Sequence, residues 1–136
     1  MNLGIRISDN LNTKPLTYAI IGVLPESLLN FRGDLIKTLI ARGGVVYGLS
    51  EPADDSVVKS LEALGARHWA YTVERRGQNP FKDVVTLLSL CQALRSIKPD
   101  VILSYTIKPV IYGGIASRLF PGARFSAMIE GLGYVF

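Results

Sequence analysis

The chain has one cysteine and one histidine among its 136 residues, and this scarcity excludes several kinds of site. The single cysteine, Cys91, cannot form an internal disulfide, and on the apolar side of a predicted helix it packs as a small hydrophobe. No His, Cys, Asp and Glu residues show the spacing of metal ligands. A Ser-His-Asp triad has only His68 available, which lies beside Trp69 in a predicted strand, where a structural role is favoured. The sequence therefore predicts neither a metal centre nor a hydrolase triad.

Long apolar runs are absent as well. No stretch reaches the roughly 18–20 apolar residues that span a bilayer. Residues 1–16 form a polar lead-in without the apolar run of a secretory signal. Hydrophobic residues make up 49% of the chain and charged residues 19%, a composition typical of globular proteins and not of disordered ones. We expect one cytoplasmic domain over residues 1–136, with its core in residues 17–136.

The net charge of +4 is unevenly distributed along the chain. Residues 1–66 carry six basic and seven acidic side chains, whereas residues 67–136 carry nine basic and four acidic ones. An excess of basic residues in the second half favours phosphate groups, an anionic lipid surface or nucleic acid as a partner. Ordinary surface charge that keeps the protein soluble is the plainer alternative, and composition alone does not separate the two.

Apolar runs alternate with helical patterns along the whole chain, which predicts an α/β fold of the Rossmann-like, three-layer type. We expect five parallel strands in the order 3-2-1-4-5, with right-handed crossovers. The third helix, 80–97, has only a narrow polar stripe, so we expect it to be mostly covered. The predicted strands are 18–23, 45–49, 68–72, 101–105 and 125–129, and the predicted helices are 27–42, 54–64, 80–97 and 109–119.

Ligands of such sheets bind outside the carboxyl ends of the strands, where the strand order reverses. Here that point lies between the first and fourth strands. The first turn, Gly22-Val-Leu-Pro-Glu-Ser27, has neither a G-x-G-x-x-G nor a P-loop motif, so we expect no tightly bound nucleotide cofactor. Glu51 follows the second strand, as a ribose-binding residue does, but without the glycines it is more consistent with a solvated turn.

Basic residues gather at the predicted binding edge. Arg75 and Arg76 precede the third helix, whose N-terminus favours phosphate, although a plain charged loop is the alternative. Asn79 is a capping residue first. Lys108 precedes the fourth helix, where the helix dipole disfavours a cation. An unfavourable charge at a binding edge indicates a functional role for Lys108. The alternative is a solvated lysine that the helix tolerates at a small cost.

Glu130 follows the last apolar strand and precedes Gly131-Leu132-Gly133. A carboxylate in this place accepts hydrogen bonds from sugar hydroxyls or acts as a base. It can equally cap the turn that follows, and the sequence leaves both roles open.

An ordered set of short motifs resembles the N-terminal domain of GT-B glycosyltransferases, in the branch that builds capsule, exopolysaccharide and O-antigen repeat units. The likeness covers about residues 19–136, and the ordered set is more specific than any one motif. The motifs are Asn30-Phe31-Arg32-Gly33, Leu64-Gly65-Ala66, Arg75-Arg76-Gly77-Gln78-Asn79-Pro80, Pro99-Asp100-Val101, Thr106-Ile107-Lys108-Pro109, Tyr112-Gly113 and Gly131-Leu132-Gly133-Tyr134.

The resemblance implies a retaining transferase, peripheral on the inner face of the cell membrane. Such an enzyme moves a sugar from a nucleotide-sugar donor, its substrate, to a polyprenyl-diphosphate-linked glycan, with no role for nucleic acid. The N-terminal domain contacts the acceptor, and a C-terminal domain with an E-x7-E signature holds the donor. That domain is absent from this chain, so we expect no activity from the chain alone. The first turn, with Leu24-Pro25-Glu26, departs from the glycine-rich loop of many relatives, which puts donor contacts there in doubt.

Carried over by position, the resemblance implies a catalytic or sugar-adjacent role for Glu130. The implied acceptor and phosphate contacts are Asn30, Arg32, Arg75, Arg76, Asn79, Thr106, Lys108, Gly131 and Gly133. The alternatives are a free-standing Rossmann-like binding module for a phosphorylated ligand, a dehydrogenase or epimerase fragment, which the missing glycine fingerprint argues against, and a receiver-like domain, whose acidic pocket is not evident.

Overall fold

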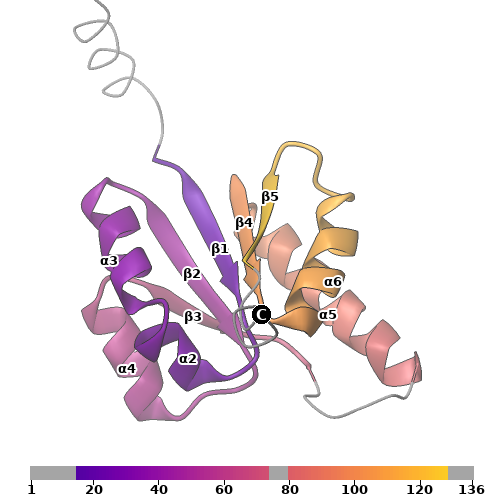
Figure 1. Ribbon diagram of the computed structural model, residues 1–136, viewed down its shortest axis with the longest axis horizontal. Helices are drawn as coiled ribbons and strands as arrows, with labels where there is room; N and C mark the ends of the chain where they lie inside the picture. The colour runs from indigo at the N-terminus through magenta and orange to yellow at the C-terminus, as the bar shows by residue number, and fades with distance from the viewer. Residues whose placement is uncertain (1–14, 74–79, 129–136) are drawn as a thin grey trace, which may run out of the picture.

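The computed structural model describes residues 15–73 and 80–128, which form one parallel sheet between two layers of helices (Figure 1). The sheet order is β3-β2-β1-β4-β5, so the predicted fold class and strand order are confirmed. All four pairings are parallel, and β1 lies in the middle between β2 and β4. The strands are β1 (Thr17–Ile21), β2 (Val45–Ser50), β3 (Arg67–Ala70), β4 (Val101–Tyr105) and β5 (Arg124–Met128).

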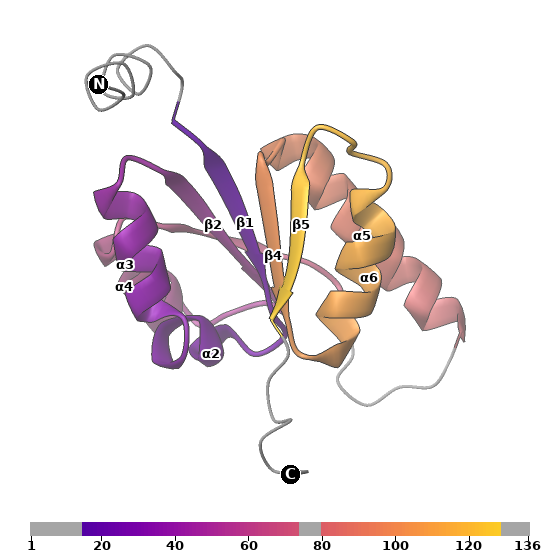
Figure 2. The same ribbon diagram turned by 45° about the horizontal axis from the view of Figure 1, so that its top comes forward.

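Side chains of the central strand alternate between two apolar cores, as the period of two in a strand requires. Ala19 and Ile21 face the core shared with α5 (Pro80–Ile97) and α6 (Ile107–Ser117). Ile20 faces the core on the opposite side, shared with α2 (Pro25–Asn30), α3 (Gly33–Ala41) and α4 (Asp55–Ala63). All three side chains are fully buried, which explains the continuous apolar run of this strand. Figure 2 shows the two helical layers on either side of the sheet.

The single helix predicted over 27–42 is wrong, because the chain forms two helices with a break at Phe31 and Arg32. Leu28 and Ile36 are both fully buried in the same core. The break lies between them, and Gly33, a poor helix former, starts the second helix.

Other boundaries also differ from the sequence prediction, and two of the differences bear on the pocket and the first turn. The fourth predicted helix begins at Ile107 and not at Pro109, so Lys108 lies in its first turn. Proline is tolerated there because the first-turn N–H groups have no partner within the helix. Strand β3 ends at Ala70. The next residue, Tyr71, donates its backbone N–H to the carbonyl oxygen of Ser50 at 2.9 Å and its hydroxyl hydrogen to the carbonyl oxygen of Gly22 at 2.6 Å.

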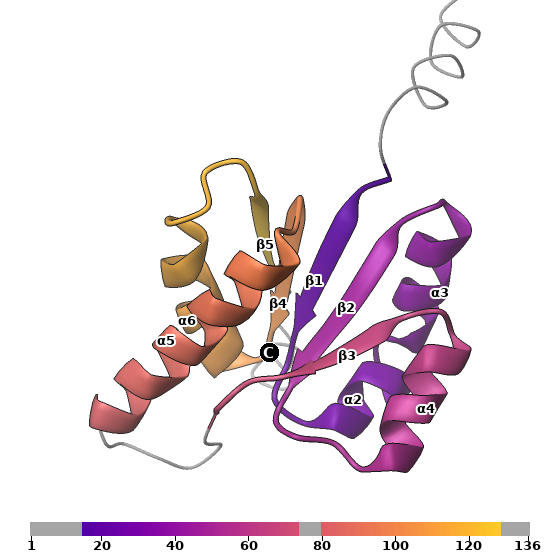
Figure 3. The same ribbon diagram turned by 180° about the vertical axis from the view of Figure 1, so that it is seen from behind.

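The prediction that the third helix is mostly covered is wrong for its N-terminal half. Leu90 and Leu94 of α5 are fully buried, but Phe81, Val84, Val85 and Leu88 are exposed to between 50% and 80%. The helical period identifies an apolar side chain without saying whether a neighbour reaches it. Figure 3 shows that the first turns of α5 extend beyond α6 and the sheet, where nothing in the described ranges covers their outer side.

Candidate functional site

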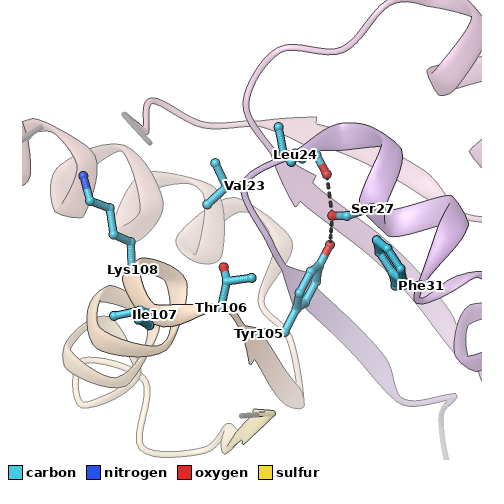
Figure 4. A pocket seen from close by; sticks show the side chains of 8 residues that line it. All are labelled: Val23, Leu24, Ser27, Phe31, Tyr105, Thr106, Ile107 and Lys108. Carbon is cyan, nitrogen blue, oxygen red and sulfur yellow. Dashed lines mark hydrogen bonds between the residues drawn. The ribbon is translucent and has the colours of Figure 1, made fainter. Parts of the chain in front are cut away.

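A pocket of about 490 Å³ opens beyond the carboxyl ends of β1 and β4, at the point where the strand order reverses (Figure 4). Its wall comes from the turn after β1, from α2, and from the junction between β4 and α6. The lining residues are Val23, Leu24, Ser27, Phe31, Tyr105, Thr106, Ile107 and Lys108. Most of this surface is apolar, and the polar atoms come from a few side chains, as in ligand sites of open α/β sheets.

A buried hydrogen-bond chain ties the two halves of the pocket together. The Ser27 hydroxyl donates to the carbonyl oxygen of Leu24 at 2.6 Å. Because this uses its only hydrogen, the Tyr105 hydroxyl is the donor in the 2.6 Å contact between Tyr105 and Ser27. Burial raises the pKa of Tyr105, although the Ser27 hydrogen bond and the charge of Arg32 act in the opposite direction. The Tyr105 phenol therefore remains protonated and keeps its role as donor.

Gly22 makes room for the ring of Tyr105. A Cβ atom at this position would collide with the phenol oxygen and ring carbons of Tyr105. The first turn therefore uses its glycine to let a tyrosine from β4 pass.

Arg32 covers the outer face of the same tyrosine. Its guanidinium carbon lies 4.7 Å from the ring centroid of Tyr105, within the range of a cation–π interaction. Its Nη1 also donates to the carbonyl oxygen of Phe31 at 3.3 Å. Arg32, at the break between α2 and α3, thus packs against Tyr105 of the pocket wall.

The junction between β4 and α6 has unusual backbone geometry. Thr106 has φ 66° and ψ 162°, a region that almost only glycine adopts and that is costly for a β-branched residue. Its carbonyl oxygen accepts the N–H of Val110 at 3.1 Å and so starts the helix. Lys108 follows within the first turn, against the preference of the helix dipole. This end of the pocket therefore combines a cation with a helix N-terminus and suits an anionic group.

A second, smaller hollow of about 340 Å³ lies at the carboxyl ends of β2 and β3. Glu51 lines it from the bend that directly follows β2 and is partly buried. Its wall is fixed by the Thr72 N–H, which donates to the Ser89 hydroxyl of α5 at 2.9 Å.

The structure brings three of the predicted site residues together. Thr106 and Lys108 line the pocket, and Arg32 contacts it through Tyr105. Asn30 ends α2 with an exposed side chain and does not line the pocket. The other six predicted residues lie outside the described residues, and these are Arg75, Arg76, Asn79, Glu130, Gly131 and Gly133.

Sequence reasoning missed Ser27 and Tyr105, the polar pair inside the pocket. The only local signal for Tyr105 is a polar group that ends an otherwise apolar strand at the binding edge. No local signal links it to Ser27, because 78 positions separate the two residues.

The other candidate reactive group, His68, has a structural role in the described part of the chain. His68 shares a 2.7 Å hydrogen bond with the Ser50 hydroxyl, and burial lowers its pKa. Within residues 15–73 and 80–128, no cluster of His, Cys, Asp and Glu is placed to hold a metal ion. None of the helices in these ranges has the length and hydropathy that crossing a bilayer requires.

Comparison with known proteins supports the fold. No protein-family model matches the chain, and no curated protein matches it either. Among solved structures, it is similar to MurG of Acinetobacter baumannii, with a TM-score of 0.64 and 18% identity over 85% of this chain and 35% of the other. A glycosyltransferase from Rickettsia africae gives a TM-score of 0.61 and 16% identity over 85% of this chain and 30% of the other.

The same fold occurs in a protein described as a UDP-N-acetylglucosamine 2-epimerase from Listeria monocytogenes, with a TM-score of 0.60 and 11% identity over 85% of this chain and 32% of the other. The chain therefore spans about a third of the length of these solved structures. At such identities the likeness establishes the Rossmann-like fold alone, and function has to be argued from the site.

Proposed function

We propose that this chain is the acceptor-binding half of a retaining glycosyltransferase that extends a polyprenyl-diphosphate-linked glycan during surface polysaccharide synthesis. The observation that carries the proposal is the pocket between β1 and β4, with an apolar wall and a cation at one end. Similarity to solved glycosyltransferases supports the reaction class. The proposals of retention of configuration and of the polysaccharide branch rest on the family resemblance of the ordered sequence motifs.

The two kinds of surface in the pocket match the two parts of such an acceptor. A diphosphate is anionic and suits the end formed by Lys108 and the first turn of α6. Leu24, Phe31 and Ile107 present apolar surface on which a prenyl chain or the apolar face of a sugar ring packs. The Ser27–Tyr105 pair holds the two walls at a fixed separation and thereby preorganises the pocket.

The donor nucleotide sugar is assigned to a second domain in the proposed enzyme. The first turn, Gly22-Val-Leu-Pro-Glu-Ser27, contains a single glycine and so forms no glycine-rich diphosphate loop. The ring of Tyr105 fills the space beside that glycine. In this division of labour the chain binds and orients the acceptor at an anionic membrane surface. Glu130 is proposed to lie near the reacting sugar. We expect the chain to transfer no sugar without the donor-binding half.

Ligand titration of the chain tests the proposal. We expect a soluble short-chain prenyl-diphosphate sugar to bind, and Lys108→Gln to weaken its binding about five- to tenfold, since a hydrogen bond to a charged group contributes about 1.5–3 kcal/mol before solvent screening. Lys59→Gln on the exposed side of α4 is the matched control and should leave binding unchanged. Tight binding of a sugar nucleotide with no response to the acceptor would reverse the assignment of the two halves.

A free-standing module that binds a phosphorylated ligand is the second candidate. It is favoured by the same cationic end of the pocket, which needs no second domain to hold a phosphate. Binding of inorganic phosphate or a sugar phosphate as tightly as the prenyl-diphosphate sugar would support this candidate, because it would show that the apolar wall contributes nothing.

A further inference from the structure

The smaller hollow at the carboxyl ends of β2 and β3, which we call the β2–β3 hollow, differs in chemistry from the pocket. Its volume of about 340 Å³ lies at the lower end of the range for small-molecule sites. Among the described residues that line it, Glu51 is the only charged one, whereas the pocket has the cation Lys108. The two cavities therefore suit different chemical groups, and the β2–β3 hollow disfavours an anion.

The wall of the β2–β3 hollow offers both an acceptor and a donor of hydrogen bonds. The carboxylate of Glu51 is an acceptor. The Ser89 hydroxyl of α5 accepts the backbone N–H of Thr72 at 2.9 Å. No residue in the ranges 15–73 and 80–128 accepts the hydrogen of that hydroxyl, so a ligand in the hollow can accept it.

The apolar part of the wall is small and shallow. Pro52 and Ala70 line the hollow, and both are exposed. A pyranose ring has hydroxyl groups around its edge and C–H groups on its faces, so it needs both kinds of contact. Each sugar hydroxyl both donates and accepts, which matches Glu51 as acceptor and Ser89 as donor. A phosphate or carboxylate group would instead bring a negative charge to Glu51.

Two hydrogen bonds join the β2–β3 hollow to the first turn, which forms part of the pocket wall. The Tyr71 hydroxyl donates to the carbonyl oxygen of Gly22 at 2.6 Å, and the Glu51 N–H donates to the carbonyl oxygen of Val23 at 2.9 Å. Burial raises the pKa of Tyr71, so its hydroxyl keeps the hydrogen that makes this bond. Val23 lines the pocket, whereas Tyr71 and Glu51 line the hollow. The two cavities are therefore neighbours across the first turn.

We infer that the β2–β3 hollow binds the pyranose ring of a neutral sugar, with Glu51 accepting and Ser89 donating hydrogen bonds to its hydroxyl groups. The charge of Glu51 selects against uronic acids and sugar phosphates. In the proposed function this ring belongs to the glycan of the acceptor, whose diphosphate lies in the neighbouring pocket. The link between the two cavities rests on the proposed function, whereas the sugar site itself does not.

Titration of the whole chain with methyl glucoside, followed by heteronuclear NMR spectroscopy, tests the sugar site. We expect chemical-shift changes at the backbone amides of Glu51 and residues 70–73. Ser89→Ala should weaken binding about threefold to tenfold, because one hydrogen bond between neutral groups is lost. Ser96→Ala, at an exposed position of the same helix, is the matched control and should leave binding unchanged. Lys108→Gln should also leave it unchanged, since the glucoside has no phosphate.

The selectivity against anions has its own test. Methyl glucuronide has the same ring with a carboxylate in place of the hydroxymethyl group, and we expect it to bind about two- to fivefold more weakly than the glucoside. Glu51→Gln should reduce this difference, because glutamine has nearly the shape of glutamate without its charge. Glu62→Gln, at an exposed position of α4, should leave the difference unchanged. Equal binding of the two sugars by the native chain would overturn the role of Glu51.

Two outcomes would overturn the sugar site itself. The first is no chemical-shift change at these amides even at a large molar excess of the glucoside, and the second is binding that Ser89→Ala and Glu51→Gln both leave unchanged. The soluble prenyl-diphosphate sugar separates the two proposals. If it does not bind while the glucoside does, only the proposed function is contradicted. If it binds and Ser89→Ala does not weaken it, the link between the hollow and the pocket is wrong.

Discussion

Replacing Gly22 by alanine tests the packing on which the pocket depends. The new methyl group would lie where the phenol ring of Tyr105 now passes, closer than real carbon atoms approach. Tyr105 has no easy way to move, because its side chain is 1% exposed, bonded to Ser27 at 2.6 Å and covered by Arg32 at 4.7 Å. The substitution must therefore displace the tyrosine or the first turn.

The expected cost of Gly22→Ala is about 2–4 kcal/mol of unfolding free energy. Overpacking of a close-packed site costs about 1–3 kcal/mol, and loss of the Tyr105 hydrogen bond adds about 1 kcal/mol. Urea denaturation followed by circular dichroism measures this change at constant slope. Acceptor binding should weaken in the same variant, because Tyr105 and Ser27 both line the pocket.

A matched glycine and a second-site change make the test specific. Gly33→Ala places a methyl group within the first turn of α3, where no heavy atom lies within 4 Å, so its stability should stay within about 1 kcal/mol of the native value. Tyr105→Leu should recover part of the loss in the Gly22→Ala background by removing the ring. If Gly22→Ala unfolds within about 0.5 kcal/mol of the native chain, the close approach of Gly22 and Tyr105 is refuted.

Three further outcomes follow from single residues. Thr106→Gly should raise the unfolding free energy by about 1 kcal/mol by relieving the backbone at φ 66°, and an unchanged or lower value would contradict the strain. Burial holds the pKa of His68 below 6.5, so the unfolded chain binds more protons between the folded pKa and 6.5. Stability should therefore fall as the pH drops through that window, and His68→Gln should remove this dependence in pH-resolved denaturation. The hydrogen bond to Asp83 raises the pKa of Tyr112 to about 12, so ultraviolet titration should show a late phenol that Tyr112→Phe eliminates.

The sheet was predictable because its signals are local and repeated. Apolar runs such as Thr17–Ile21 and Val101–Tyr105 alternate with helical periods, and right-handed crossovers then leave few strand orders to choose from. The chain break at Phe31 and Arg32 was not predictable in this way, because the apolar residues on both sides of it keep the spacing of a single helix. The exposure of Phe81 and Leu88 was hidden as well, because a helical period does not say what covers a face.

The residues alone marked one lining position of the pocket, where the sequence breaks a local rule, and the family resemblance added Arg32 and Thr106. Lys108 opposes the helix dipole, and in the structure it lines the pocket. Ser27 breaks no rule in its own helix, and its bond to Tyr105 arises only when β1 and β4 pair in the sheet. Polar pairs formed across a fold are therefore the part of a site that reading along the chain does not supply.

The junction between β4 and α6 forms one end of the pocket. Thr106 adopts a costly backbone conformation, Ile107 is 78% exposed, and Lys108 stands in a first helical turn that prefers anions, so three consecutive residues each depart from local stability. The residues just before them, Ser104 and Tyr105, are almost completely buried and hold the junction in place. Departures of this kind concentrate where function opposes stability. Because Thr106, Ile107 and Lys108 all line the pocket, an anionic ligand bound there would interact favourably with both the lysine and the N-terminus of α6.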